Sequence, residues 1–229
     1  MATVFLLGDS TCANKSMDLL PETGWGMCFG VFLAFGWKLE NHAVNGLSTR
    51  SALGKGVYEA MRKRCAKGDW VIIQFGHNDS KPDAERHADP WGEYQDNLRK
   101  MVEGIRAQGA SAIILSSIER RRFLDGVAQR TLGAYPDAAR DVAKELSVPF
   151  VPMHVLTRSL YQELGTQASC RLFNHVPRRL WPNYPQGKED DTHLSLYGAQ
   201  SIAGIIATSL RGKVPFIDPG PSVLPRTTC

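Results

Sequence analysis

Hydrophobic positions in this chain gather into five short runs, separated by segments with the spacing of amphipathic helices. The runs lie at residues 4–7, 39–44, 70–75, 112–116 and 149–151. Short apolar runs that alternate with helical segments are typical of α/β proteins, in which helices cover both faces of a parallel sheet. The pattern therefore predicts an α/β fold with these five runs as strands.

Three segments between or after the runs have apolar residues on one helical face. These residues are Tyr94, Leu98, Met101, Val102 and Ile105; then Ala138, Val142 and Leu146; and finally Ala199, Ile202, Ala203, Ile206 and Leu210. Ser195 precedes the third segment and is expected to cap that helix. Because no repeat or linker divides the pattern, we expect residues 1–212 to form a single domain.

The two segments that lack such periodicity are interpreted differently. Residues 170–188 are rich in proline, asparagine and aromatic residues and are expected to form an ordered loop. Residues 213–229 contain four prolines, which exclude a helix there. This C-terminal segment is expected to be either an extended arm over the surface or disordered.

Composition narrows the class of protein and its partners. A chain of 229 residues that is 43% apolar can bury a large core without disulfides. The net charge of +4 is spread along the chain, so no nucleic-acid partner is expected. The densest basic stretches, at residues 119–122 and 178–179, are either solvated surface or contacts to an acidic sugar polymer.

Cysteine usage and hydropathy bear on compartment and cofactors. The five scattered cysteines have no metal-ligand spacing, which favours free thiols in a reducing compartment, with one disulfide as the alternative. His42, His87, His154 and His175 also lack partners at ligand spacing, so no metal is expected. The longest apolar stretch, residues 27–37, is too short to span a bilayer. Because Val4 already belongs to the first strand, we expect no signal peptide and a cytoplasmic protein. A secreted protein that had lost its signal would have the same sequence.

Polar residues that follow the first strand suggest a nucleophile. Residues 8–11 read Gly-Asp-Ser-Thr, and the strand delivers Ser10 to the carboxyl edge of the sheet, where α/β proteins keep their chemistry. On its own this sequence is a common turn. Near the other end of the chain, Asp190 and His193 are three residues apart, so the carboxylate can reach the imidazole ring. Ser10, His193 and Asp190 would be nucleophile, base and orienting acid of a hydrolase, and a serine hydrolase needs no other cofactor.

Two further strands end in candidates for an oxyanion hole. Gly46 follows the second run and could lend its backbone N–H, although Asn-Gly is also a plain turn signal. Asn78 follows the third run and would donate its side-chain amide, unless Asn78 and Asp79 only form an Asx turn and a helix cap. All these positions meet at one edge of a doubly wound sheet.

These motifs resemble the SGNH (GDSL-like) hydrolase family, whose blocks are Gly-Asp-Ser, an isolated Gly, Gly-x-Asn-Asp and Asp-x-x-His, in this order. The stretches 24–26 (Gly-Trp-Gly), 46–51 (Gly-Leu-Ser-Thr-Arg-Ser), 76–79 (Gly-His-Asn-Asp) and 183–193 are similar to the rhamnogalacturonan acetylesterase branch. The resemblance implies a flavodoxin-like three-layer α/β/α sandwich with strand order 2-1-3-4-5. It implies Ser10, His193 and Asp190 as triad, and the Ser10, Gly46 and Asn78 groups as oxyanion hole.

The resemblance also implies a serine esterase that removes O-acetyl groups from plant cell-wall sugars, with pectic, rhamnogalacturonan-type oligosaccharides as the leading substrate. Trp25, Trp181 and Tyr184 are candidate sugar-stacking surfaces, and His77 a candidate at the mouth of the site; each could equally be a packing residue. Two alternatives stay open: a lipase or thioesterase for longer acyl esters on the same scaffold, and a non-catalytic carbohydrate- or ligand-binding domain. The sequence leaves the oligomeric state unknown.

Overall fold

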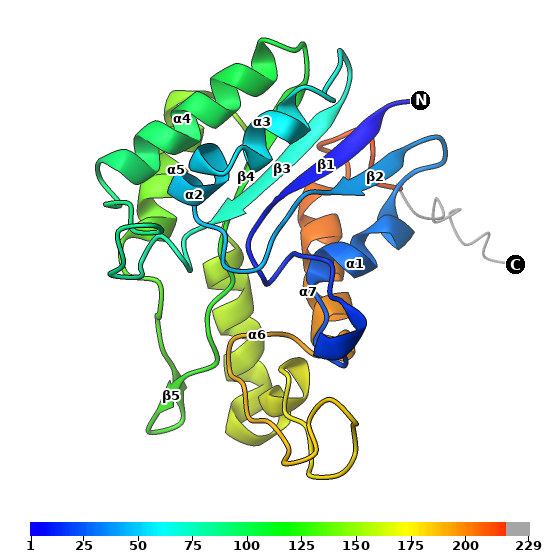
Figure 1. Ribbon diagram of the computed structural model, residues 1–229, viewed down its shortest axis with the longest axis vertical. Helices are drawn as coiled ribbons and strands as arrows, with labels where there is room; N and C mark the ends of the chain where they lie inside the picture. Colours follow the sequence, from blue (N-terminus) through cyan, green and yellow to red (C-terminus); the bar gives the residue numbers. More distant parts are fainter. Residues whose placement is uncertain (219–229) are drawn as a thin grey trace, which may run out of the picture.

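A five-stranded parallel sheet forms the middle layer of the structure, a computed structural model that describes residues 1–218 (Figure 1). Its strands are β1 (Thr3–Gly8), β2 (Lys38–Asn41), β3 (Trp70–Phe75), β4 (Ser111–Ser116) and β7 (Phe150–Val151). Their order is β2-β1-β3-β4-β7, and every neighbouring pair is parallel. Because β7 is the fifth predicted run, the expected order 2-1-3-4-5 is confirmed.

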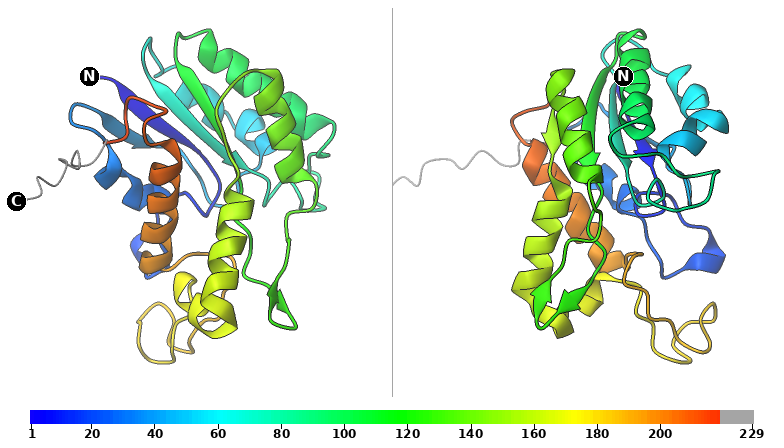
Figure 2. Two further views of the ribbon diagram at one scale, coloured as in Figure 1. Left: turned by 180° about the vertical axis from the view of Figure 1, so that it is seen from behind. Right: turned by 90° about the vertical axis from the view of Figure 1, so that its left-hand side faces the viewer.

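Helices cover both faces of this sheet, which confirms the three-layer α/β/α fold (Figures 1 and 2). The α-helices are α1 (Trp25–Phe29), α2 (Thr49–Gly54), α3 (Val57–Arg62), α4 (Glu93–Arg106), α5 (Tyr135–Glu145), α6 (Met153–Ala168) and α7 (Leu196–Leu210). The short 3₁₀ helices are η1 (Met17–Leu19), η2 (Gly30–Phe32) and η3 (Ser169–Leu172), and β5 (Phe123–Leu124) pairs with β6 (Val127–Ala128) in a small hairpin.

The alternation of side chains along β1 explains why there are two cores. Val4 and Leu6 point to one face and pack with α1, α6 and α7. Phe5 and Leu7 point to the other face and pack with the layer of α2 to α5. All four side chains are at most 2% exposed. A strand buried on both faces reads as a continuous apolar run, which is the pattern that the sequence has there.

The second strand is shorter than predicted. Although the His42 and Val44 N–H groups still donate to the Leu6 and Gly8 carbonyls of β1 at 2.8 and 3.1 Å, the regular strand ends not at Val44 but at Asn41, whose side chain folds back onto the chain. Its Oδ1 accepts a hydrogen bond from the Ala43 N–H at 3.0 Å, and its Nδ2 donates to the Cys12 carbonyl at 2.9 Å. The chain therefore stays beside β1 up to Val44 and carries the following loop to the carboxyl end of β1.

Residues 213–218, the start of the predicted C-terminal arm, pack against the sheet layer. The Phe216 ring lies between the Trp37 and Trp70 rings, with centroids 5.7 and 5.5 Å away. The Phe216 carbonyl accepts a hydrogen bond from the Ala34 N–H at 2.9 Å. The remainder of the arm, residues 219–229, lies outside the described residues.

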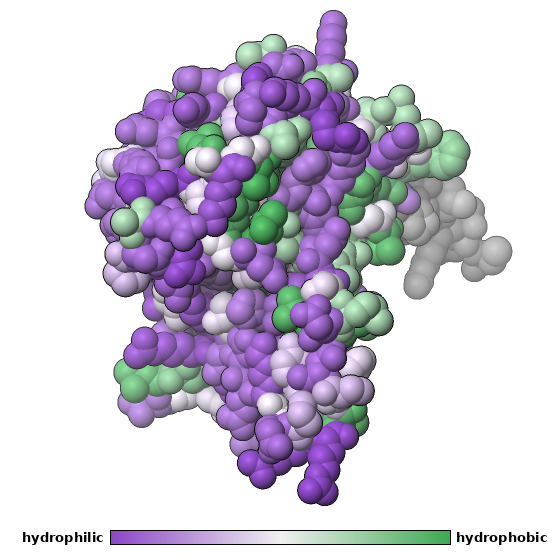
Figure 3. Space-filling view, viewed as in Figure 1, coloured by the Kyte–Doolittle hydropathy of each residue, from purple (hydrophilic) through white to green (hydrophobic). Residues whose placement is uncertain are grey.

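The surface on the side viewed in Figure 1 is mainly hydrophilic, with apolar groups at the β5–β6 hairpin, where Leu124 and Val127 are exposed (Figure 3). This hairpin has no counterpart in the sequence prediction, because two-residue strands are too short to show a period. Within residues 1–218 no helix combines the length and apolar character that crossing a bilayer requires.

Candidate functional site

Ser10 lies in the turn directly after β1, and its neighbours shape that turn. The buried Asp9 carboxylate accepts hydrogen bonds from the Thr11 N–H at 2.9 Å and the Thr11 hydroxyl at 2.8 Å. The Asp9 carbonyl accepts two more, from the Cys12 and Ala13 N–H groups. The residues on either side of the serine thus close the turn and leave the Ser10 side chain free to face a cavity.

The late Asp-x-x-His segment meets this serine. The His193 Nε2 lies 3.0 Å from the Ser10 Oγ, and the His193 Nδ1 lies 2.8 Å from the Asp190 Oδ2. Because a carboxylate only accepts hydrogen bonds, Nδ1 carries the proton and Nε2 is left to accept from the Ser10 hydroxyl. The other Asp190 oxygen accepts from the Thr192 and His193 N–H groups at 2.8 and 2.9 Å. Although burial acts to raise it, these hydrogen bonds hold the pKa of Asp190 well below its usual range.

The backbone on both sides of His193 is anchored to the rest of the fold. The His193 carbonyl accepts a hydrogen bond from the Asn174 N–H at 2.8 Å, and Leu194 pairs with Phe173. The α7 helix begins immediately afterwards, and Ser195 caps it by accepting from the Gly198 N–H at 3.1 Å, as predicted. The imidazole is therefore carried by the residue immediately before a β-bridge, which is itself followed directly by the start of a helix.

The groups predicted for an oxyanion hole line the same cavity as Ser10 and His193, which has a volume of about 430 Å³. Gly46 occupies a tight turn at φ +77°, a backbone conformation that favours glycine. The Asn78 Nδ2 donates one of its two protons to the Leu47 carbonyl at 3.0 Å. This bond fixes the amide plane and leaves the second N–H of Asn78 for a ligand.

Asp79, the alternative candidate for an Asx turn or helix cap, caps the N-terminus of α2, a helix that precedes it in the chain. Its Oδ1 accepts from the Thr49 N–H at 2.8 Å and from the Thr49 hydroxyl, at the start of α2. Burial raises the pKa of this carboxyl to about 7, against the hydrogen bonds from Thr49. Asp79 thus ties the segment after β3 to the segment after β2, where the Gly46 turn lies.

His77 lines the cavity, yet only 3% of its surface is exposed. Its Nε2 donates to the Ile118 carbonyl at 2.7 Å, and its Nδ1 faces the Asp9 carboxylate at 3.7 Å. Burial lowers the pKa of His77. The ring is therefore held on two sides beneath the site, a supporting position next to Asn78.

Of the three aromatic residues predicted as candidates for sugar stacking, the prediction for Trp25 is wrong. It is fully buried in the core, and its Nε1 donates to the Gln74 Oε1 at 2.6 Å. The glycine before it reflects close packing, since a Cβ on Gly24 would lie 2.1 Å from the Ala13 carbonyl oxygen. The Gly-Trp-Gly stretch that resembled the acetylesterase branch thus packs α1 against the turn that carries Ser10.

Trp181 and Tyr184 lie in the 173–195 loop and are not among the described residues that line the cavity. Trp181 is 38% exposed, and the Tyr184 hydroxyl donates to the Leu19 carbonyl at 2.9 Å. Tyr184 therefore fastens this loop to η1. Asp191 points away from the Asp190–His193 pair and forms ion pairs with Arg121 at 2.9 Å and with His175 at 2.8 Å.

A buried network of charges that the sequence did not reveal lies beside the triad. The Lys15 side chain is fully buried and forms an ion pair with Glu22 at 2.8 Å. Lys188 bridges Glu22 at 3.3 Å and Asp190 at 3.2 Å. Although burial acts to raise it, Lys15 holds the pKa of Glu22 below its usual range. No spacing rule singles out Lys15 or Glu22, because their partners come from distant segments.

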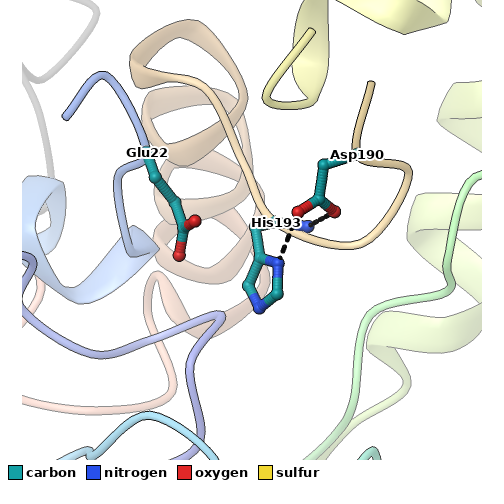
Figure 4. Close-up of side chains that lie close together, drawn as sticks. All are labelled: Glu22, Asp190 and His193. Atoms are coloured by element: carbon teal, nitrogen blue, oxygen red, sulfur yellow. Dashed lines mark hydrogen bonds and ion pairs between the residues drawn. The ribbon is translucent and has the colours of Figure 1, made fainter. Parts of the chain in front are cut away.

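The side chains of Glu22, Asp190 and His193 also converge, with ligand atoms within 4.8 Å of one another (Figure 4). This separation alone would suit a metal ion. Both carboxylates, however, already pair with the ammonium groups of Lys15 and Lys188. The protein's own lysines therefore balance the negative charges of these two carboxylates. This pairing supports the prediction that the protein uses no metal, which stays a prediction.

A comparison with protein families identifies the chain. The model of the GDSL-like Lipase/Acylhydrolase family matches residues 6–201, a span that includes every block from Ser10 to His193. The chain belongs to this family. Rhamnogalacturonan acetylesterase RhgT of Bacillus subtilis is 39% identical in sequence, and the alignment covers 90% of this chain and 88% of the RhgT chain. A rhamnogalacturonan acetylesterase of Emericella nidulans is 24% identical over 88% of this chain and 81% of its own.

Solved structures agree on the fold. Protein YxiM of Bacillus subtilis superimposes with a TM-score of 0.78 at 22% identity, over 91% of this chain and 56% of that one. A variant of Axe2, an acetylxylan esterase from Geobacillus stearothermophilus, has a TM-score of 0.65 at 19% identity, over 91% and 94%. At such identities the likeness supports the shared α/β/α architecture.

Proposed function

We propose that this family member is a serine esterase that removes O-acetyl groups from carbohydrate, with acetylated pectic oligosaccharides as its leading substrate. The observation that carries the proposal is the continuous hydrogen-bonded chain from Asp190 through His193 to Ser10, with 2.8 and 3.0 Å between successive partners. A serine is a poor nucleophile unless an adjacent base takes its proton, and this chain provides the base and its orienting acid. The acetylesterase relatives support the choice of acyl group and of sugar.

The reaction would proceed through an acetyl-enzyme. The Ser10 Oγ attacks the acetyl carbonyl carbon while the His193 Nε2 takes the hydroxyl proton. The oxyanion that forms accepts hydrogen bonds from the N–H groups of Ser10 and Gly46 and from the Asn78 side chain. The C–O bond to the sugar then breaks, and His193 gives its proton to the departing sugar oxygen. A water molecule, deprotonated by His193, attacks the acetyl-serine carbonyl; the bond to Ser10 Oγ then breaks, His193 returns the proton to that oxygen, and acetate leaves. No step requires a cofactor.

The cavity favours a short acyl group and a polar partner. Among the described residues that line it, Leu19 alone is apolar, and the others include Glu22, Asn45, Lys81 and Thr192. A long acyl chain gains most of its binding free energy from burying apolar surface, about 0.8 kcal/mol per methylene, and this lining offers little of it. A lipase or long-chain thioesterase is therefore the weaker alternative.

The test compares the wild-type protein with Ser10→Ala. We expect acetate release from acetylated pectin, xylan and mannan fragments, highest for pectin, and a steep fall in rate on p-nitrophenyl esters longer than butyrate. Ser10→Ala should lose at least about a thousandfold in kcat with an unchanged circular dichroism spectrum. Turnover retained in Ser10→Ala would contradict the mechanism, and failure of a fluorophosphonate to label Ser10 would favour the non-catalytic binding domain.

A further inference from the structure

The cavity carries three cationic side chains besides those around the triad, and they differ in how their charges are balanced. Lys81, Arg86 and Arg120 all line the cavity. Arg86 pairs with Asp83, with Nη2 and Oδ2 2.7 Å apart. Lys81 is exposed, and its ammonium group has no hydrogen-bond or ion-pair partner within residues 1–218. In the described part of the chain, only one of these three cations therefore has a carboxylate partner.

Arg120 is the unusual member of this set because it is half-buried without a counter-ion among the described residues. Its Nη1 donates to the Thr131 carbonyl at 3.1 Å and its Nη2 to the His77 carbonyl at 3.2 Å. Both acceptors are neutral, and together they use two of the five N–H groups of the guanidinium. The neighbouring Glu119 carboxylate bonds to the Thr131 N–H at 2.6 Å instead. Burial lowers the pKa of Arg120, as expected for a cation removed from water without a paired anion.

The anionic groups around the cavity do not supply the missing partner. Glu22 forms ion pairs with Lys15 and Lys188. Asp190 pairs with Lys188 and with His193. The Asp9 carboxylate accepts from Thr11. Asp9 and Glu119 act on Arg120 through space, but neither carboxylate forms a hydrogen bond or ion pair with its guanidinium, which donates to the Thr131 and His77 carbonyls instead.

We propose that Arg120 and Lys81 form a subsite that binds the carboxylate of an acidic sugar next to the acetylated residue. This inference rests on the proposed esterase function and names its substrate class. A planar guanidinium with free N–H groups matches a carboxylate in a two-point interaction, which a neutral sugar hydroxyl does not provide. Because Arg120 holds the carbonyl of His77, the residue before Asn78, the subsite borders the oxyanion donor. The bound uronate would thereby position the ester of the adjacent sugar.

The experiment uses one pair of substrates: an acetylated oligogalacturonide, and the same oligosaccharide after its carboxyl groups have been reduced to alcohols. The quantity measured is the ratio of kcat/KM for the acidic form to kcat/KM for the neutral form. We expect Arg120→Gln to lower this ratio about tenfold or more, as for a lost charged hydrogen bond. We expect about threefold for Lys81→Gln, whose exposed charge is screened. Arg120→Lys, which keeps the charge without the fork, should fall between Arg120→Gln and the wild type.

Lys100→Gln is the matched control, because Lys100 is exposed on α4 and outside the cavity lining. Its ratio should equal that of the wild type. Added salt should raise the KM of the wild type for the acidic form and leave that for the neutral form unchanged. An unchanged ratio in both Lys81→Gln and Arg120→Gln, or an equal fall in Lys100→Gln, would overturn the subsite.

Two further outcomes complete the test. One distinguishes failure of the subsite from failure of the esterase, and the other shows whether the subsite binds an acidic sugar or the acetate product. If the wild type hydrolyses both forms at equal rates, the subsite is refuted and the esterase stands; if it hydrolyses neither form nor any aryl acetate, the esterase itself is refuted. Free acetate is the other anion present during turnover. If Arg120→Gln relieves inhibition by acetate without changing the ratio, the cations bind the product rather than an acidic sugar, and the proposal fails.

Discussion

The Lys15 ammonium group lies 2.6 Å from the carbonyl oxygen of Ser10, and the same group contacts two other parts of the site. It donates to the Asn45 Oδ1 at 2.8 Å, next to Gly46, and pairs with the Glu22 carboxylate at 2.8 Å. One buried cation thus connects the serine turn, the Gly46 turn and, through Glu22 and Lys188, the Asp190 loop. The three loops that must hold their relative positions during catalysis share this one anchor.

The first prediction is that Lys15→Met lowers both stability and kcat. The substitution leaves the buried Glu22 with one partner, the partly exposed Lys188, so the loss of stability should stay below the roughly 3 kcal/mol that a fully unpaired buried charge costs. With the loops less fixed, kcat on p-nitrophenyl acetate should fall about tenfold. Urea denaturation and steady-state kinetics measure the two effects.

The double variant Lys15→Met/Glu22→Gln is the control, because it removes both charges of the pair. It should regain part of the lost stability but little of the lost kcat, since the contacts to Ser10 and Asn45 stay broken. A Lys15→Met protein with wild-type stability and kcat would show that this network is incidental to the site.

The second prediction concerns Asn78. Removing a single oxyanion donor typically costs about a hundredfold to a thousandfold in kcat, so Asn78→Ala should lose this much, with a smaller change in KM. Because the same amide also bonds to the Leu47 carbonyl, a moderate loss of stability is expected as well. The matched control is Asn97→Ala, since Asn97 donates to the nearby Thr49 hydroxyl but does not line the cavity. Equal losses of kcat in the two variants would argue against a role of Asn78 at the oxyanion.

The third prediction is a pH dependence controlled by the Asp190–His193 pair. The base must be a neutral imidazole, so kcat/KM should rise with pH along the acidic side of its profile. Asp190→Asn should lower kcat about ten-thousandfold, because an amide can donate to Nδ1 and favour the wrong tautomer. A flat profile for the wild type, with chemistry shown to be rate-limiting by substrate variation, would exclude His193 as the base.

The sequence was sufficient for the sheet and for the blocks at its carboxyl edge. Runs buried on both faces are unmistakable, as at 4–7 and 70–75, and parallel strands must end at one edge, so Ser10 and Asn78 could be placed together without coordinates. The strand order followed from the family resemblance. Element boundaries were less accurate, as at Asn41, where the regular strand ends although hydrogen bonds to β1 continue to Val44.

What the sequence lacked were features that depend on several distant segments at once. Lys15 is one of 27 basic residues, and only the fold brings residues 10, 22 and 45 around it. Trp25 was misassigned because an aromatic near the nucleophile suits a sugar platform and a core equally well. Arg120 belonged to a basic stretch expected on the surface or against an acidic sugar, and its half-buried position at the cavity follows only from its contacts with His77 and Thr131.

The last prediction is that Asp79→Asn changes how stability depends on pH. The pKa of this carboxyl is about 7 in the folded protein against 3.8 for the free group, so between these values the folded state binds a proton that the unfolded state has released. The contribution of Asp79 to stability should therefore fall as pH rises from about 4 to about 7, by on the order of 2 to 4 kcal/mol, and be constant above. Asparagine is neutral throughout, and its oxygen can keep the contacts with Thr49.

The free energy of unfolding of both proteins, measured in urea at pH 5 and at pH 8, tests this. Asp79→Asn should gain on the wild type as pH rises, whatever its offset at pH 5. Asp96→Asn serves as the control, because the Asp96 side chain is 73% exposed and its removal should give a difference that hardly varies with pH. If the difference between Asp79→Asn and the wild type is the same at both pH values, the Asp79 carboxyl is ionised in the folded state at neutral pH. Its buried Oδ2, which has no hydrogen-bond partner within residues 1–218, would then need another source of stabilisation.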